Sequence, residues 1–209
     1  DPPGPGSQYA ESDVSSIRRF GAEVASVLEA QGLVGRPLFW VRDREKLLND
    51  LEGILKHDHQ RENRGTTIAT ELSFGLPDSK FPPLERILPS GRAVNFRGSI
   101  DRVERTETGS LIVIDYKTGK IGDYQNLSSD NPTLGGSQLL QPLYALAATT
   151  YLGEEPETGH ALYWFTSDSE LWATHGYAIN PDILEKVRKL HDTGGPKKQC
   201  RTGPVAARL

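Results

Sequence analysis

The sequence predicts an α/β fold in which helices flank a mixed β-sheet. Two observations lead to this prediction: the chain opens with segments whose apolar residues recur at helical spacing, and later segments are rich in β-branched residues and alternate. The expected order is two helices, three strands, a helix, two strands and a last helix. With 209 residues, 36% of them apolar, the chain can bury one substantial core.

Two helices are predicted in the first part of the chain. Apolar residues recur at helical spacing from about Asp13 to Gln31, and Gly32 follows as a stop. A second helix is expected from Asp43, a favourable N-cap, to about His59. Both helices are expected to serve as scaffold for the rest of the domain.

The sheet is predicted to begin near Thr66. The segment LIVIDYK is apolar on both faces, which is typical of a central strand that is covered on each side. The polar connection 119–136, with its Gly, Asn and Pro residues, is expected to lie at the surface. The predicted strands are 66–76, 93–101, 111–117, 160–167 and 171–179, and the predicted helices among them are 137–153 and 181–190.

The expected organisation is one compact domain with short extensions. Residues 1–11 are predicted to form a flexible linker, residues 12–195 the domain and residues 196–209 a loosely ordered tail. Within the domain, 12–62 would form a helical scaffold and 66–190 the sheet core. The chain begins at Asp1 and contains no methionine, which predicts a fragment of a longer protein.

Composition excludes several classes of function. A formal charge of −4 disfavours a protein that coats nucleic acid through a broadly basic surface, so any phosphate binding is expected to be local. No apolar run approaches the roughly 20 residues that cross a bilayer, and a cytoplasmic protein is expected. Cys200 is the only cysteine, which excludes an internal disulfide or a site built from several thiolates of this chain.

The stretch IDRVERTETGSLIVIDYKTGK, residues 100–120, predicts a β-hairpin that brings two acids together. Glu107-Thr108-Gly109 fits a three-residue loop with Gly109 at the left-handed position. If Thr106 faces Ser110, the register places Asp101 opposite Asp115, and Lys117 lies on the same face. Opposed carboxylates destabilise a sheet unless a proton or a cation offsets their repulsion.

These three side chains predict a site for a hard divalent cation beside a positive group. At this point the sequence resembles a known family: GSID followed by VIDYKTGK is similar to the paired motifs of the RecB-type nucleases of the PD-(D/E)XK superfamily. ATELSFG resembles the preceding acidic strand of that family, and QLLQPLYALAA resembles its glutamine–tyrosine helix. The resemblance covers about Glu71 to Tyr144 and implies a restriction-endonuclease-like core.

The resemblance also implies roles for individual residues. Asp101 and Asp115 would hold Mg2+ or Mn2+, with Glu71 as a further acidic ligand and the backbone carbonyl of Tyr116 completing the shell. Lys117 would orient the attacking water or stabilise charge on the phosphate. A glutamine and a tyrosine of the following helix would support the site and the DNA backbone. The candidates are Gln141 and Tyr144, and Gln138 is a competing candidate for the glutamine.

The sequence departs from the family pattern in two places. The family spacing is Gln-x-x-x-Tyr, whereas Gln141 precedes Tyr144 by three residues. Many relatives carry an upstream histidine in a Gly-x-x-x-His helix and an iron–sulfur cluster on four cysteines. Gly53 and His57 have that spacing, but the histidine of the family usually lies further upstream in the sequence. The iron–sulfur cluster cannot be built from this chain alone, which has one cysteine.

The resulting hypothesis is a metal-dependent DNA nuclease, cut from a helicase–nuclease or another DNA repair or recombination protein. Exonuclease action on single-stranded DNA is expected over endonuclease action, with a helicase domain or subunit as partner. The alternative is a catalytically idle DNA-binding or scaffold module of a helicase–nuclease complex. A nuclease that acts on RNA or on structured junctions stays open as a third possibility.

Other polar and aromatic residues have simpler interpretations. The two aspartates and Lys117 could form a salt-bridged patch, and His57 and His59 could be a solvated helix end. Tyr163, Trp164, Phe165 and Trp172 fit core packing better than base stacking.

Overall fold

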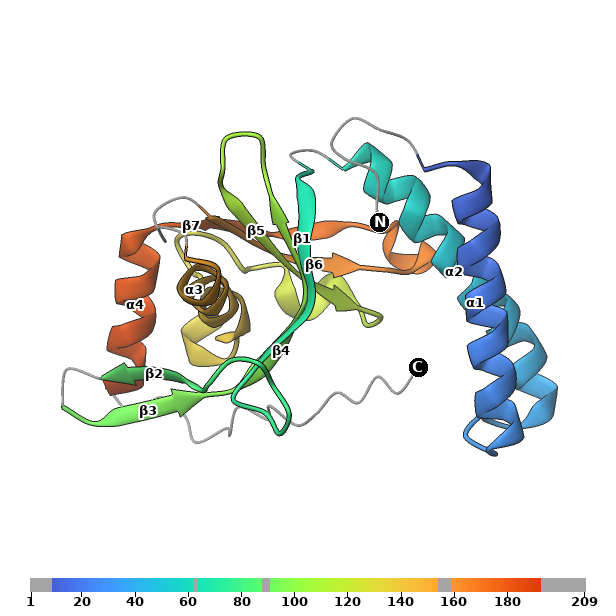
Figure 1. The fold of residues 1–209 in the computed structure, drawn as a ribbon, viewed down its shortest axis with the longest axis horizontal. Helices are drawn as coiled ribbons and strands as arrows, with labels where there is room; N and C mark the ends of the chain where they lie inside the picture. The colour runs from blue at the N-terminus through green and yellow to red at the C-terminus, as the bar shows by residue number, and fades with distance from the viewer. Residues whose placement is uncertain (1–8, 62–63, 88–90, 154–158, 193–209) are drawn as a thin grey trace.

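The computed structural model describes residues 9–61, 64–87, 91–153 and 159–192. It confirms the predicted α/β class, with a five-stranded mixed sheet flanked by helices (Figure 1). The helices are α1 (Glu11–Ala30), α2 (Pro37–Gln60), α3 (Leu140–Leu152) and α4 (Pro181–Asp192), with short 3-10 helices η1 (Ile121–Tyr124), η2 (Leu134–Gly136) and η3 (Asp168–Glu170). The strands are β1 (Thr66–Phe74), β2 (Leu84–Ile87), β3 (Ala93–Phe96), β4 (Gly98–Arg105), β5 (Leu111–Lys117), β6 (Gly159–Phe165) and β7 (Thr174–Ile179).

The main sheet has the strand order β1-β4-β5-β6-β7, and β2 pairs with β3 in a separate two-stranded ribbon. β5 and β6 are parallel, and the other neighbours in the sheet are antiparallel. A parallel pair needs a crossover connection, and here α3 lies within it. β5 is therefore the central strand, as its double-sided apolar pattern predicts.

The two faces of the sheet have different covers. On one face α3 packs against β5 and β6, over the buried side chains of Val113, Ala161 and Phe165. On the other face Ile54 of α2 packs against Ile112, Ile114 and Trp164. Because side chains alternate along a strand, neighbouring residues of β5 belong to different layers. Figure 1 shows α1 and α2 as a helical pair at one end of the molecule, with α3 and α4 at the other.

Three sequence predictions are corrected by the structure. The segment 93–101 is not one strand: it divides near Arg97 into β3 and β4, because β3 pairs with the unpredicted β2. α2 begins at Pro37 rather than at Asp43, with proline in the first turn, where its missing N–H is no loss. The connection 119–136 contains η1 and η2 and buries Leu127, so it is partly packed.

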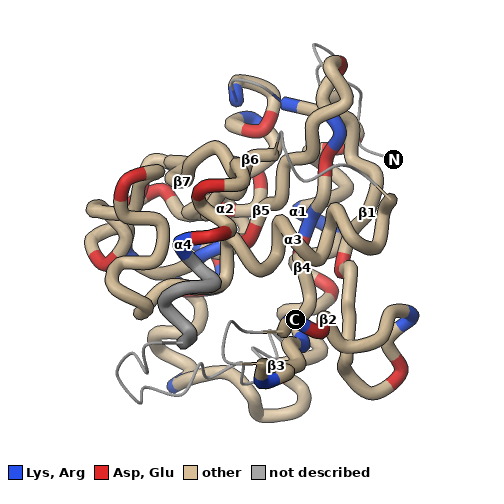
Figure 2. The backbone as a smooth tube through the Cα atoms, turned by 90° about the vertical axis from the view of Figure 1, so that its left-hand side faces the viewer, with Lys and Arg blue, Asp and Glu red and all other residues tan. Residues whose placement is uncertain are grey.

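The termini of the predicted domain organisation lie mostly outside the described residues. The proposed linker overlaps the described part only at its end, where α1 begins at Glu11, and the tail 196–209 is not described. Within the described part, none of the helices combines the length and the apolar character that a membrane crossing requires. Figure 2 shows acidic and basic residues interspersed along the chain, as the modest net charge suggests.

Candidate active site

The hairpin that joins β4 and β5 has the predicted register. Val103 pairs with Val113 and Arg105 with Leu111, and the loop closes through the hydrogen bond from Thr106 N to Ser110 O at 2.9 Å. Gly109 has φ +88°, the left-handed conformation that a side chain would strain. The loop chemistry therefore sets which residues of β4 lie beside the end of β5.

The ladder between β4 and β5 stops at the pair Arg102 and Ile114, one step before the two acids. Ile100 and Val103 pack in the same core although they are three residues apart, so the side-chain alternation of β4 shifts between them. At this shift Asp101 turns toward β5, and its Oδ2 accepts a hydrogen bond from the Tyr116 N–H at 2.7 Å. The carboxylate thus accepts the backbone N–H that a carbonyl of β4 would accept if the strand pairing continued.

Asp115 is buried on β5, beside Lys117 two residues along the same strand. Its Oδ2 forms an ion pair with Nζ of Lys117, which also lies 5.1 Å from the ring centroid of Tyr163. Burial raises the pKa of Asp115 to about 6, Lys117 opposes this shift, and the charge of Asp101 adds to it. The two aspartates therefore interact electrostatically, as the hairpin register predicts.

Asp101 is half-buried and shows the same conflict between burial and charge. Burial raises its pKa above the ordinary value, although the Tyr116 N–H and Lys117 act in the opposite direction. Two carboxylates with raised pKa values and one ammonium group thus occupy the end of β5. Perturbed acids of this kind are typical of sites that bind cations or carry out proton chemistry.

Glu71 lies on β1 at the level of Asp101, between the ladder pairs Thr70–Arg102 and Leu72–Ile100. It has φ +49°, an unusual conformation for a residue with a side chain. Its carboxylate is exposed and accepts a hydrogen bond from Ser99 Oγ at 3.2 Å. β1 and β4 are both irregular at this level, which is where the acids gather.

The hydroxyl of Tyr144 on α3 lies close enough to all three acids for their charges to act on it. Burial, followed by the negative charges of Asp115, Asp101 and Glu71, raises the pKa of its hydroxyl well above the ordinary value. A Cβ atom at Gly98 would lie 2.9 Å from Cε1 of this ring. The absence of a side chain at Gly98 therefore leaves room for the ring of Tyr144 beside the acids. The sequence alone did not reveal that a glycine is needed at this position.

The two candidate glutamines occupy different places. Gln138 Oε1 accepts a hydrogen bond from the Tyr163 hydroxyl at 3.5 Å, and the ring of Tyr163 lies under Lys117. Gln141 is buried, and its Nε2 donates to the carbonyl of His175 on β7 at 3.3 Å. Gln138 is therefore linked to the lysine through one tyrosine, while Gln141 contacts the strand at the edge of the sheet.

Residues 8–199 match the sequence family described as the PD-(D/E)XK nuclease superfamily. The chain belongs to this superfamily. The family resemblance in the hairpin motifs is thereby confirmed, and the mixed sheet flanked by helices agrees with the restriction-endonuclease-like core that it implies.

Curated relatives are named as the B subunit of an ATP-dependent helicase/deoxyribonuclease. The chain is 26% identical to that of Bacillus thuringiensis (strain Al Hakam) over 164 residues, which is 76% of this chain and 12% of the relative. Shorter matches reach 41% identity over 64 residues in Geobacillus kaustophilus and 49% over 55 residues in Clostridium tetani, covering 29% and 25% of this chain and 5% of each relative. The chain thus corresponds to a small part of these proteins.

The oxygen donors of this PD-(D/E)XK chain are of the kind that Mg2+ or Mn2+ prefers. Mg2+ usually keeps several of its waters and binds to one or two protein carboxylates. Asp101 and Asp115 supply two carboxylates, which matches that number. Oδ2 of Asp115 is buried, and its neighbour in the described structure is the Lys117 ammonium group. Among the described residues, no three acidic, histidine or cysteine side chains form a ready-made ion cage.

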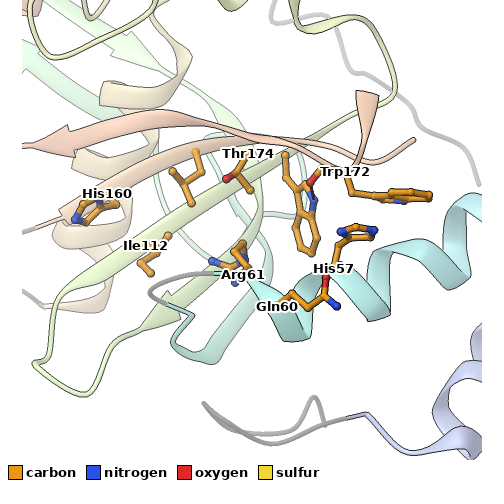
Figure 3. A pocket seen from close by; sticks show the side chains of 9 residues that line it. His57, Gln60, Arg61, Ile112, His160, Trp172 and Thr174 are labelled. Carbon is orange, nitrogen blue, oxygen red and sulfur yellow. Dashed lines mark hydrogen bonds between the residues drawn. The ribbon is translucent and has the colours of Figure 1, made fainter. Parts of the chain in front are cut away.

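The histidine spacing in α2 has a packing explanation in this chain. Trp172 occupies the space above Gly53, where a Cβ atom would collide with the indole, and it stacks on His57 with ring centroids 4.4 Å apart. His57 lines the α2 face of the sheet together with Ile112 (Figure 3). Asp115 alternates with Ile114 of that face, and its charge acts on Tyr144 of α3 on the other side. The structure therefore does not bring His57 to the acids.

A buried ion network joins α2 to β4 behind the site. Arg102 donates to Asp58 Oδ2 at 3.1 Å and lies 2.6 Å from Glu104 Oε1, and Arg61 contacts the same two carboxylates. Burial raises the pKa of Asp58, but the Arg102 guanidinium, the Tyr9 hydroxyl and the other arginines outweigh burial and hold that pKa below its ordinary value. This network fixes the strand that carries Asp101.

Proposed function

We propose that this chain is a metal-dependent nuclease module that hydrolyses phosphodiester bonds of DNA. The observation that supports the proposal best is the convergence of Asp101, Asp115 and Lys117 at the end of β5 in a member of a nuclease superfamily. Burial of two acids costs folding free energy unless they have a cation to bind. A cation-binding role accounts for that cost.

In this proposal Asp101 and Asp115 hold Mg2+ or Mn2+, with Glu71 and the backbone carbonyl of Tyr116 as further oxygen donors. The ion would supply a water of lowered pKa and would neutralise charge on the phosphate. Lys117 would direct the attacking water and stabilise the developing charge from its position beside Asp115. Tyr144, with Gln138 or Gln141, would position the DNA backbone.

The proposed substrate is single-stranded DNA, and the proposed action is that of an exonuclease. The relatives are named as subunits of a helicase/deoxyribonuclease, and this chain corresponds to a small part of them. A module of this kind would receive a strand from a helicase partner, and local rather than broad positive charge would then be sufficient. Repair or recombination of DNA is the process that would use such a module.

The proposal is tested by incubating the purified chain with end-labelled single-stranded DNA and Mg2+ or Mn2+. Cleavage is expected with either ion, and neither EDTA-treated protein nor Asp115→Ala should cleave. Equal cleavage by the wild-type and variant chains would indicate a contaminating nuclease. Absence of cleavage by both would support the idle-module alternative. A circular single strand separates the two modes of action, because an exonuclease needs an end, and RNA and junction substrates test the third possibility.

A further inference from the structure

Tyr163 of β6 lies beside the candidate active site, although its aromatic character predicts only core packing. It pairs with Asp115 in the parallel ladder between β5 and β6, and paired residues point to the same face of a sheet. Tyr163 is 1% exposed and packs in the core cluster that contains Tyr144 and Ala145 of α3. The ring therefore lies on the face of the sheet that carries Asp115, out of contact with solvent.

In the described part of the chain, two contacts place the ammonium group of Lys117. One is the ion pair with Oδ2 of Asp115, and the other is the ring of Tyr163, whose centroid lies 5.1 Å from Nζ. A cation within about 6 Å of an aromatic ring centroid is attracted to the negative face of the ring, more strongly where water is excluded. The side chain of Lys117 is 25% exposed, so the ring contacts it from the core while part of it still meets solvent.

The ring of Tyr163 is held in one orientation by its other neighbours. The ring of Tyr124 on η1 meets it edge-on, with centroids 4.6 Å apart and an interplanar angle of 60°. The Tyr163 hydroxyl donates a hydrogen bond to Oε1 of Gln138 at 3.5 Å. Burial, followed by the charge of Asp115, raises the pKa of this hydroxyl well above its ordinary value, so the side chain remains neutral. Tyr163 thus offers the lysine a fixed, uncharged surface.

The two contacts of Lys117 respond differently to a divalent cation at the acids. A cation at Asp115 offsets the negative charge of the carboxylate and repels the ammonium group, so the ion pair weakens. The attraction between the ammonium group and the ring does not depend on that carboxylate. Without the ring, the flexible stem of a lysine that loses its ion pair would be free to turn into solvent.

We propose that Tyr163 is a positioning residue, whose ring keeps the Lys117 ammonium group at the acids when a divalent cation is bound. The inference rests on the proposed nuclease function, in which Lys117 acts on the attacking water and on the phosphate. It adds to that function a residue that touches neither the ion nor the DNA. The expected effect is on kcat rather than on KM, because misplacing a catalytic group slows the reaction of bound substrate.

The position of Lys117 can be measured by NMR without any cleavage. Protons above the face of an aromatic ring resonate upfield, so the Hε protons of Lys117 should be shifted upfield in the wild-type chain. Lys117→Met assigns these protons by their loss. The shift should remain in Tyr163→Phe, which keeps the ring, and should largely disappear in Tyr163→Leu. In the wild-type chain it should also remain when added Mg2+ changes the carboxyl resonance of Asp115.

Cleavage of end-labelled single-stranded DNA measures the consequence for the reaction. Tyr163→Leu should lower kcat by about 10-fold to 100-fold with KM little changed. Tyr163→Phe loses only the bond to Gln138 and should lower kcat no further than Gln138→Ala does. Tyr177→Leu is the matched control, because Tyr177 is buried in the same core and its hydroxyl donates to the Pro132 carbonyl at 2.6 Å. This control should leave kcat per folded molecule near the wild-type value.

A variant of nearly unchanged shape separates the ring's charge distribution from its packing. Pentafluorophenylalanine at position 163 is close in size to phenylalanine but has a positive ring face, so it should repel the ammonium group. It should lower kcat well below that of Tyr163→Phe, whereas a role in packing alone predicts equal rates. Chemical denaturation gives the folded fraction of each variant.

Three results would overturn the proposal. The first is an upfield shift of the Lys117 protons that Tyr163→Leu does not change. The second is equal kcat for phenylalanine and pentafluorophenylalanine at position 163. The third is loss of the shift in the wild-type chain once Mg2+ changes the Asp115 resonance. A wild-type chain that keeps the shift but does not cleave DNA would instead refute the nuclease function, and the placement of Lys117 by Tyr163 would stand.

Discussion

The carboxylate of Asp101 accepts the backbone N–H of Tyr116 at 2.7 Å, across the gap where β4 and β5 separate. The hydrogen bond holds one acid beside the strand that carries the other, and burial raises the pKa of both. Rigid strands thus keep together two charges that repel each other in the absence of a cation. The expected consequences for stability and activity can be measured.

Asp115→Asn should stabilise the metal-free protein while it abolishes cleavage. A folded-state pKa of about 6, above that of the unfolded chain, means that ionised Asp115 destabilises the fold. This cost is fully present above about pH 6 and vanishes below about pH 4. In EDTA at pH 8 the variant should gain about 1–3 kcal/mol in free energy of unfolding, with little gain at pH 4. Asp123→Asn, at an exposed position, is the control, and an unchanged or lower stability at pH 8 would contradict the prediction.

Lys117→Met should raise the pKa of Asp115 further, because the Lys117 charge lowers that pKa in the wild-type chain. The carboxyl resonance of Asp115, followed by NMR as a function of pH, measures the shift. Cleavage should fall by about 100-fold to 1,000-fold, the usual effect of losing one group that stabilises transition-state charge. Lys120→Met, at an exposed position three residues along, should change neither quantity. An unchanged pKa would show that the ion pair is weak in solution.

Gly98→Ala should displace Tyr144. The added Cβ would lie 2.9 Å from Cε1 and 3.2 Å from the hydroxyl oxygen of the tyrosine, so the ring must move. Overpacking of this kind costs about 1–3 kcal/mol, measured by chemical denaturation, and cleavage should fall as well. Gly122→Ala is the matched control, because no atom lies within 4 Å of the position that its added Cβ would take, and its backbone is unstrained. Equal stability of the two variants would refute the packing argument.

Glu104→Gln should be strongly destabilising. The Glu104 side chain is fully buried, contacts Arg61 and Arg102, and accepts the Gly65 N–H at 2.9 Å. Loss of its charge removes one of the two carboxylates that the buried guanidinium groups of Arg61 and Arg102 share, the other being Asp58, at a cost of about 3–5 kcal/mol. Thermal unfolding of the variant, beside Glu107→Gln in the exposed hairpin loop, provides the measurement. A difference below about 1 kcal/mol would mean that water enters the network.

Substitution of the two glutamines by alanine should separate their roles. Gln138→Ala removes the acceptor of the Tyr163 hydroxyl, so cleavage should fall while stability changes little. Gln141→Ala removes a buried amide that holds the β7 backbone, so stability should fall by about 1–3 kcal/mol. Cleavage rates per folded molecule, with stability from denaturation, distinguish the two. The reverse pattern would assign the site role to Gln141.

The local chemistry of the sequence accounts for the hairpin and its acids. Gly109 fixes the loop, the loop fixes the register, and the register brings Asp101 to the end of β5. The shift in alternation near Asp101 was not predictable, because it depends on where β1 pairs and where β5 departs. The place of Tyr163 opposite Asp115 likewise follows from the parallel pairing of β5 with β6, a long-range contact without a local signal.

The helices show the same division between local and distant causes. The helical spacing of apolar residues predicts α1 and α4 to within two residues at each end, and it predicts α2 apart from the six residues before Asp43. The aromatic character of Trp172 predicts packing, but its left-handed backbone with φ +49° and its contact with Gly53 depend on the distant helix α2. β2 is short and mostly exposed, so it has no pattern that distinguishes it from a loop.

The parallel pairing of β5 with β6 has a consequence for synthesis on the ribosome. The hairpin can close as soon as residue 117 has emerged, but the strand that shields Asp115 begins only at Gly159, beyond the α3 crossover. Until that strand docks, Asp115 is exposed to water and lacks the burial that is the largest cause of its raised pKa. In a growing polypeptide the pKa of Asp115 therefore reaches its folded-state value late, after most of the domain has been made.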